Sequence, residues 1–150
     1  DGKWIKENLT NKNHLRGALK SYRKECFEVI GGLKEAMGWD TVDELLAQYH
    51  GWELLVIEDL EVKHLRPTAS RYNLQAQYMQ GGMFYRLRYG GLLSLLASAK
   101  LAYKKRSFRL FWDYMKGYFI AKKQKQSFLV SPEEGKWIRA YRWRHIKRKF

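Results

Sequence analysis

The stretch Leu60-Glu-Val-Lys-His-Leu-Arg-Pro-Thr-Ala-Ser70 divides the chain into two parts with different hydrophobic periodicity. Its first half is rich in residues that favour strands. Pro67 ends that run, because proline donates no ladder hydrogen bond and pushes the residue before it out of the helical region. Beyond Pro67 the apolar residues recur at helical spacing. The second part is therefore predicted to be helical, with segments over 73–89, 92–105, 108–123 and 132–148.

Capping residues and glycines mark the expected boundaries of these helices. Gly81-Gly82 is expected to interrupt the first of them. Ser107 can cap the third. The motif Ser131-Pro-Glu-Glu134 combines an N-cap residue, a proline at the first helical position and acids in the first turn, so it predicts the start of the fourth helix.

The part before Pro67 is predicted to mix helices with short strands. Thr41-Val-Asp-Glu44 matches a capping box and predicts a helix from Val42 to His50. Another helix is expected over Tyr22–Ile30, ended by Gly31-Gly32. Short strands are expected at Trp4–Glu7, Leu15–Ser21, Trp52–Ile57 and Leu60–Leu65. The predicted fold class is α/β, mostly helical.

Charge is unevenly distributed along the 150 residues, which carry 29 Lys and Arg against 15 Asp and Glu, a net charge of +14. Residues 1–63 hold 9 basic and 12 acidic side chains, whereas residues 64–150 hold 20 basic and 3 acidic. The second part is expected to meet something anionic: nucleic acid, an acidic membrane surface or substrate phosphates. The longest apolar run, Gly90–Ala99, is about half of the ~18–20 residues that a bilayer crossing needs.

Four short blocks follow one another in an order typical of one enzyme family. The first is Gly17-Ala-Leu-Lys-Ser-Tyr-Arg-Lys-Glu-Cys-Phe-Glu-Val-Ile-Gly-Gly-Leu33, and the second is Gly38-Trp-Asp-Thr-Val-Asp-Glu-Leu-Leu-Ala47. Gly51-Trp-Glu53 and the stretch that begins at Leu60 complete the series. With these blocks, residues 15–70 resemble the second half of the catalytic domain of family 2 glycosyltransferases, which have the GT-A fold. The helical tail is similar to extra C-terminal helices of a bacterial subgroup.

The resemblance implies a division of the chain into two regions. Residues 1–70 would be the acceptor-side part of a GT-A catalytic domain, with a few short strands, and residues 71–150 a basic, aromatic helical region. The family's nucleotide-binding half carries a DxD-type motif whose carboxylates hold a divalent cation on the donor diphosphate. This sequence has no such motif. We therefore expect the donor-binding half to lie outside it, and this chain alone to be inactive.

The activity that the resemblance implies is that of a bacterial glycosyltransferase of polysaccharide biosynthesis. The intact enzyme would transfer a sugar from a nucleotide-sugar donor to a glycan or lipid-linked acceptor by a single inverting displacement. It would work in the cytoplasm, at the inner face of the cytoplasmic membrane. Mg or Mn would steady the diphosphate, bound mostly by the donor-binding half.

By the same resemblance, Asp40 is the expected catalytic base. Inverting transfer needs a base beside the acceptor hydroxyl, and a carboxylate at a helix N-terminus stays ionised because the helix dipole favours the anion. Asp43 is the alternative, since a register slip of three residues would bring it to the same place. Trp39, where the family usually has a glutamate, is a candidate platform for a sugar ring. Without the resemblance, Asp40 is an ordinary helix N-terminal acid and Trp39 a packing residue.

The stretch that begins at Leu60 supplies candidates for binding the donor diphosphate. His64 matches a position that is a metal ligand in relatives with a histidine there, and imidazole suits Mn²⁺ better than Mg²⁺. Arg66 and Arg71 could offset the charge of the diphosphate, Arg66 by a bidentate contact. The alternatives are a partly buried histidine and a solvated basic loop.

Aromatic and apolar residues form a stripe in the segment 108–123, with Lys and Arg on both sides. The stripe consists of Phe108, Phe111, Trp112, Met115, Tyr118 and Phe119. Such a stripe is typical of a helix in a membrane interface, whose cations meet lipid phosphates, and equally of a helix packed in a core. A basic helical module that binds an anionic membrane or nucleic acid without catalysis is thus the alternative function, although no nucleic-acid motif is present.

Overall fold

The computed structural model describes residues 20–57 and 74–148. These two ranges contain six helices: α1 (Lys24–Val29), α2 (Trp39–Tyr49), α3 (Leu74–Arg86), α4 (Gly90–Lys104), α5 (Phe108–Lys123) and α6 (Pro132–Lys147). Neither range contains a strand, so the predicted α/β class, with a partial GT-A sheet region, is wrong. Trp52–Ile57 is irregular because strand-favouring residues form a strand only when another strand pairs with them. The predicted strands Trp4–Glu7 and Leu60–Leu65, and most of Leu15–Ser21, lie outside the described residues.

Local sequence motifs predict the starts of some helices correctly, but not of others. α6 begins at Pro132 as predicted, and its capping box is complete: Ser131 Oγ accepts from Glu134 N at 3.2 Å, and Glu134 Oε2 accepts from Ser131 N at 2.6 Å. Ser107 is the N-cap of α5 by position only, since its side chain makes no capping hydrogen bond. The capping box predicted at Thr41 is wrong. α2 begins after Gly38, whose left-handed backbone (φ 74°) turns the chain into the helix.

α3 and α5 cross with their main chains in contact. A Cβ atom on Gly81 would overlap the carbonyl oxygen of Tyr114, and one on Gly117 would overlap that of Tyr78. The glycines therefore allow an approach that any side chain would prevent. The predicted interruption of this helix at Gly81-Gly82 is wrong. α3 continues through both residues, and they form the surface that α5 packs on.

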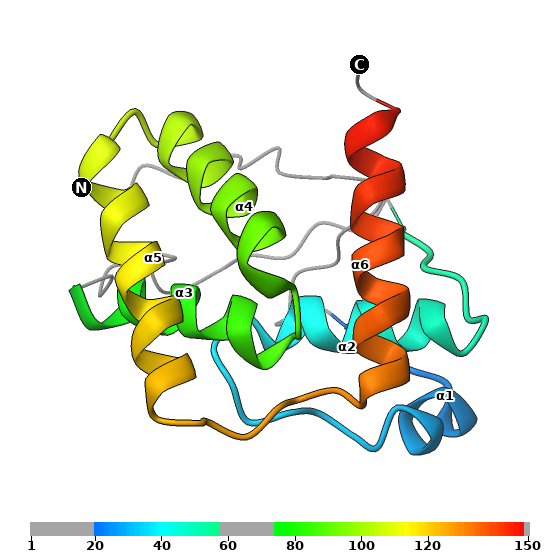
Figure 1. Cartoon of the computed structure of the whole chain (residues 1–150). Helices are drawn as coiled ribbons and strands as arrows, with labels where there is room; N and C mark the ends of the chain where they lie inside the picture. The colour runs from blue at the N-terminus through cyan, green and yellow to red at the C-terminus, as the bar shows by residue number, and fades with distance from the viewer. Residues whose placement is uncertain (1–19, 58–73, 149–150) are drawn as a thin grey trace, which may run out of the picture.

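The helices form one packed body in which α3, α4 and α5 contact one another and α2 contacts α6. In Figure 1, α2 and α3 run across the lower part of the view, and α4, α5 and α6 rise from it. Buried residues from all six helices and their connections share a single apolar core. Its largest fully buried apolar side chains are Leu45, Leu46, Leu87, Ile138 and Val42. No helix within the described ranges is long and apolar enough to span a membrane.

Candidate functional site

The first two turns of α2 bring the sequence-predicted residues Trp39, Asp40 and Asp43 together around Lys20. The Lys20 side chain is 2% exposed, and its Nζ lies 2.8 Å from Asp43 Oδ1 and 3.0 Å from Glu44 Oε1. The same ammonium donates to the main-chain carbonyl oxygen of Asp40. One buried cation thus ties the segment before α1 to the start of α2, and neutralises charge that burial would otherwise penalise.

Asp43 is occupied on both of its carboxylate oxygens. Oδ1 accepts from Lys20 Nζ and, at 2.6 Å, from the backbone N–H of Glu44, while Oδ2 accepts from the Tyr22 hydroxyl. Burial, the hydrogen bond to Asp43 and the charge of that carboxylate hold the pKa of Tyr22 well above its ordinary value. Asp43 is 1% exposed, so no acceptor hydroxyl reaches it in this arrangement.

Asp40 is the less buried of the two candidate bases. Asp40 is half-buried in the first turn of α2, where the N-terminal end of the helix favours an anion. Trp39 is also half-buried, and Lys20 Nζ lies 5.7 Å from the centroid of its ring. A sugar could therefore stack on this ring only by the face that Lys20 does not approach.

The residues predicted for the donor diphosphate, His64, Arg66 and Arg71, lie outside the described residues and stay predictions. Within 20–57 and 74–148, no three His, Cys, Asp or Glu side chains gather in a way that could hold a metal ion. The predicted Mg or Mn site would therefore need ligands from beyond these two ranges.

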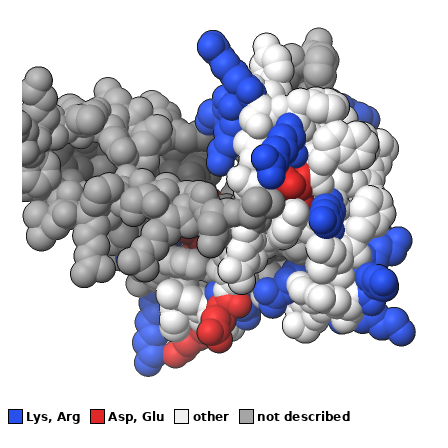
Figure 2. Space-filling model, turned by 90° about the vertical axis from the view of Figure 1, so that its left-hand side faces the viewer, with Lys and Arg blue, Asp and Glu red and all other residues white. Residues whose placement is uncertain are grey.

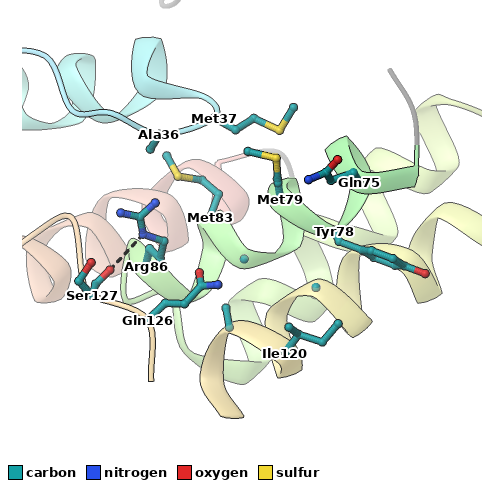
Figure 3. Close-up of a pocket in the computed structure, with 13 residues that line it drawn as sticks. Ala36, Met37, Gln75, Tyr78, Met79, Met83, Arg86, Ile120, Gln126 and Ser127 are labelled. Carbon is teal, nitrogen blue, oxygen red and sulfur yellow. Dashed lines mark hydrogen bonds between the residues drawn. The ribbon is translucent and has the colours of Figure 1, made fainter. Parts of the chain in front are cut away.

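The larger hollow, of about 560 Å³, opens between the loop before α2, α3 and the end of α5. Figure 3 shows Met37, Met79 and Met83 on one side of it, and Arg86 beside Ser127, to whose carbonyl oxygen Arg86 Nε donates at 3.0 Å. The described residues of its wall are apolar with amide and guanidinium groups, and none of them is a carboxylate. The character of this wall would suit an amphipathic molecule.

A smaller hollow, of about 320 Å³, lies between the end of α2 and α6. Trp137 and Tyr141 stack in its wall with ring centroids 5.0 Å apart, and Tyr141 donates to Gln48 Oε1 at 2.9 Å. The remaining lining residues are Gly51, Trp52, Arg144, His145 and Arg148. Aromatic faces beside arginines suit a sugar or base that carries an anionic group.

The outward face of α4 and α5 carries large apolar residues in contact with solvent. On α5 they include Phe108, Trp112 and Phe119, which are 75%, 61% and 57% exposed. The predicted stripe is therefore divided, because Met115 and Tyr118 are buried in the protein and Phe111 is half-buried. Figure 2 looks onto the side of the molecule where α5 lies, and basic side chains stand among uncharged ones across the surface there.

Sequence reasoning missed the partners of Asp43 and the apolar face of α4. Lys20 and Tyr22 lie more than 20 residues before Asp43, and nothing in either segment signals the pairing. The sequence does contain a pattern that could have predicted the α4 face, because Leu92, Leu96 and Tyr103 recur at helical spacing. All three are exposed in the structure.

Comparisons with family models, with curated proteins and with solved structures found no match.

Proposed function

We propose that the chain is the acceptor-side part of a family 2-like glycosyltransferase, which transfers a sugar from a nucleotide-sugar donor to a glycan or lipid-linked acceptor. The observation that carries this proposal is the start of α2. There Lys20 holds the main chain at Asp40, while Asp43 is saturated by Lys20, Tyr22 and a backbone N–H. Two of the sequence blocks that motivate the assignment, residues 17–33 and 38–47, thus meet at the start of α2, where the half-buried Asp40 lies.

In the proposed reaction, Asp40 takes the proton of the acceptor hydroxyl as its oxygen attacks the anomeric carbon. The bond from that carbon to the donor diphosphate breaks, the nucleoside diphosphate leaves with the electron pair, and the configuration inverts. A divalent cation would neutralise the leaving diphosphate. Its ligands, and the donor site, would belong to a donor-binding half outside this sequence.

The test is Asp40→Asn in an enzyme that includes the donor-binding half, with transfer to acceptor as the readout. Loss of a general base should lower kcat about 10²-fold or more, with little change in protein stability. Glu35→Gln removes an exposed acid from the loop before α2 and serves as the matched control, with an unchanged rate. Full turnover in Asp40→Asn would remove the base assignment. Sugar transfer by residues 1–150 alone would contradict the assignment of the donor site to another half.

A second candidate is a basic helical module that binds an anionic surface without catalysis. The exposed apolar residues of α4 and α5, with cations around them, favour it. Asp40→Asn would leave such binding unchanged, whereas changes to the exposed apolar residues of α4 and α5 would weaken it. The two functions are therefore separable, and one protein can have both.

A further inference from the structure

Two adjacent helices each expose large apolar side chains to solvent, and we call this surface the α4–α5 face. It comprises Leu92, Leu95, Leu96 and Tyr103 on α4 and Phe108, Trp112 and Phe119 on α5. Both helices contact α3, and they contact each other. The residues opposite the α4–α5 face fill the interior: Leu93, Ser94, Ser98 and Ala102 on α4 and Tyr114, Gly117, Tyr118 and Ala121 on α5. The exposed residues are therefore surplus to the packing of the core.

Basic side chains border the α4–α5 face at both ends of the two-helix hairpin. Between Gly90 and Lys123 the sequence holds eight Lys and Arg and a single acid, Asp113. Asp113 is buried, with Oδ2 3.9 Å from Arg109 Nε, so it places little negative charge at the surface. Exposed cations gather at the turn between α4 and α5 and at the end of α5: Lys104, Lys105, Arg106, Lys122 and Lys123.

The chemistry of the α4–α5 face identifies what covers it. Leucines have no face for base stacking, so a nucleic-acid surface would leave half of this area unused. A second copy of the chain would bring two strongly basic surfaces together, which electrostatic repulsion opposes. An anionic bilayer satisfies both features, because acyl chains accept the leucines and aromatic rings while lipid phosphates attract the flanking Lys and Arg.

We propose that α4 and α5 dock in the plane of an anionic phospholipid surface, with the α4–α5 face inserted at the boundary between headgroups and acyl chains. This proposal rests on the exposure and charge of α4 and α5, so it stands or falls independently of sugar transfer. It requires no transmembrane segment.

The test is co-sedimentation of the full chain with vesicles of phosphatidylcholine, alone or mixed with phosphatidylglycerol. Binding is expected only to the mixed vesicles, and raising the salt concentration should weaken it. Neutralising Lys104, Lys105 and Arg106 to Gln should lower the partition coefficient about 10²-fold, at roughly fivefold per cation. The matched control neutralises three exposed cations elsewhere, Arg23, Lys24 and Lys136, and should change binding much less.

Apolar insertion is tested separately from charge. Phe108→Ser and Trp112→Ser, singly and together, should each weaken binding to the mixed vesicles about tenfold or more, since a buried aromatic ring is lost in each case. Leu55→Ser is the control, because Leu55 is 77% exposed but lies after α2, away from the α4–α5 face. All of these positions are exposed, so helical circular dichroism should be unchanged in every variant.

Depth in the bilayer gives a second readout. Cys26 is the one cysteine of the sequence and is buried, so a Cys26→Ser background allows a nitroxide label at Trp112→Cys or at Leu55→Cys. Vesicles should shield the first label, and not the second, from a polar relaxation agent.

Three results would overturn the proposal. The first is equal binding to neutral and mixed vesicles. The second is self-association that Phe108→Ser and Trp112→Ser abolish, which would assign the α4–α5 face to a second copy. The third is oligonucleotide binding that requires the cations but not the rings, without binding to vesicles.

Discussion

Lys20 shows how much of the candidate site depends on a single side chain. Its ammonium contacts two carboxylates and a main-chain carbonyl oxygen, all in the first two turns of α2, and it is almost completely buried. Among the described residues, one cation contacts two acids here, and the backbone N–H of Glu44 and the Tyr22 hydroxyl also donate to Asp43.

Lys20→Met should therefore be strongly destabilising, because it removes the cation that contacts the buried carboxylates of Asp43 and Glu44. Removing one partner of a buried ion pair costs about 3–5 kcal/mol, measured as the free energy of unfolding in urea. Lys24→Met is the matched control, since Lys24 is 82% exposed and its pair with Glu28, at 3.8 Å, lies at the surface. Equal stability of the two variants would show that the buried cluster contributes nothing.

Tyr22 makes stability depend on pH in the alkaline range. Its raised pKa means that the folded protein holds the phenolic proton more tightly than the unfolded chain does. The resulting stabilisation is complete below the unfolded pKa of about 10 and is lost as the pH rises further towards the folded pKa. Burial also raises the pKa of Tyr114 and of Tyr118, so their effects have the same sign.

Tyr22→Phe should lower stability at pH 7 by about 1–3 kcal/mol, because Asp43 Oδ2 loses its donor inside the protein. It should also make the fall in the unfolding midpoint above pH 10 smaller. Chemical denaturation followed by circular dichroism at a series of pH values measures both effects. Tyr103→Phe makes the same chemical change at a side chain that is 87% exposed, and should leave stability at pH 7 unchanged.

Sequence alone could place Asp40 and Asp43 near the start of a helix, but could not choose between them. They lie three residues apart, so both belong to the first turns of α2. The difference between them is the contact of Asp43 with Lys20 and Tyr22, which are distant in sequence. Such long-range pairing leaves no local motif in the sequence, whereas a helix cap does.

At the scale of elements, the crossing of α3 and α5 sets the strictest packing requirement. Gly117→Ala should lower the free energy of unfolding by about 1–3 kcal/mol or more, because its methyl group would overlap the main chain at Tyr78. Gly91→Ala is the control: nothing lies within 4 Å of its added methyl group. Its stability should be unchanged or raised by up to about 1 kcal/mol, since alanine favours helix over glycine. A neutral Gly117→Ala would contradict the close approach of the two helices.

Sequence patterns predicted helical elements well where the signal was local. α5 begins at Phe108 and α6 at Pro132 as expected, since Ser131 and Glu134 lie within one turn of each other. The predicted helix over Tyr22–Ile30 is shorter in the structure, at Lys24–Val29. Gly81-Gly82 has the sequence pattern of a helix break, although in the structure it allows α5 to pack closely on α3. A glycine pair that ends a helix and one that lies at a close helix–helix contact look the same in sequence.

At the scale of the whole molecule, the predicted α/β class failed because strands depend on partners. Trp52–Ile57 has strand-favouring residues, but no described segment pairs with it. The resemblance in four sequence blocks supplied the expectation of a sheet, and blocks of that length constrain local residues more than they constrain architecture. The uneven distribution of charge, in contrast, can be predicted from composition alone. The structure adds that part of the excess positive charge lies on two neighbouring helices, α4 and α5.

The glycine contacts between α3 and α5 also limit how the molecule can move. Shear motion between helices normally proceeds through small adjustments of interdigitating side chains. Here the main chains already touch, so sliding one helix along the other by a turn would force a side chain into the opposing main chain. α3 and α5 are therefore expected to move together as one rigid unit. Rearrangement of α4 or α6 would have to occur at their connections. There Arg88 and Arg106, on the two sides of α4, and Lys125, before α6, adopt left-handed backbone conformations (φ 57°, 50° and 49°).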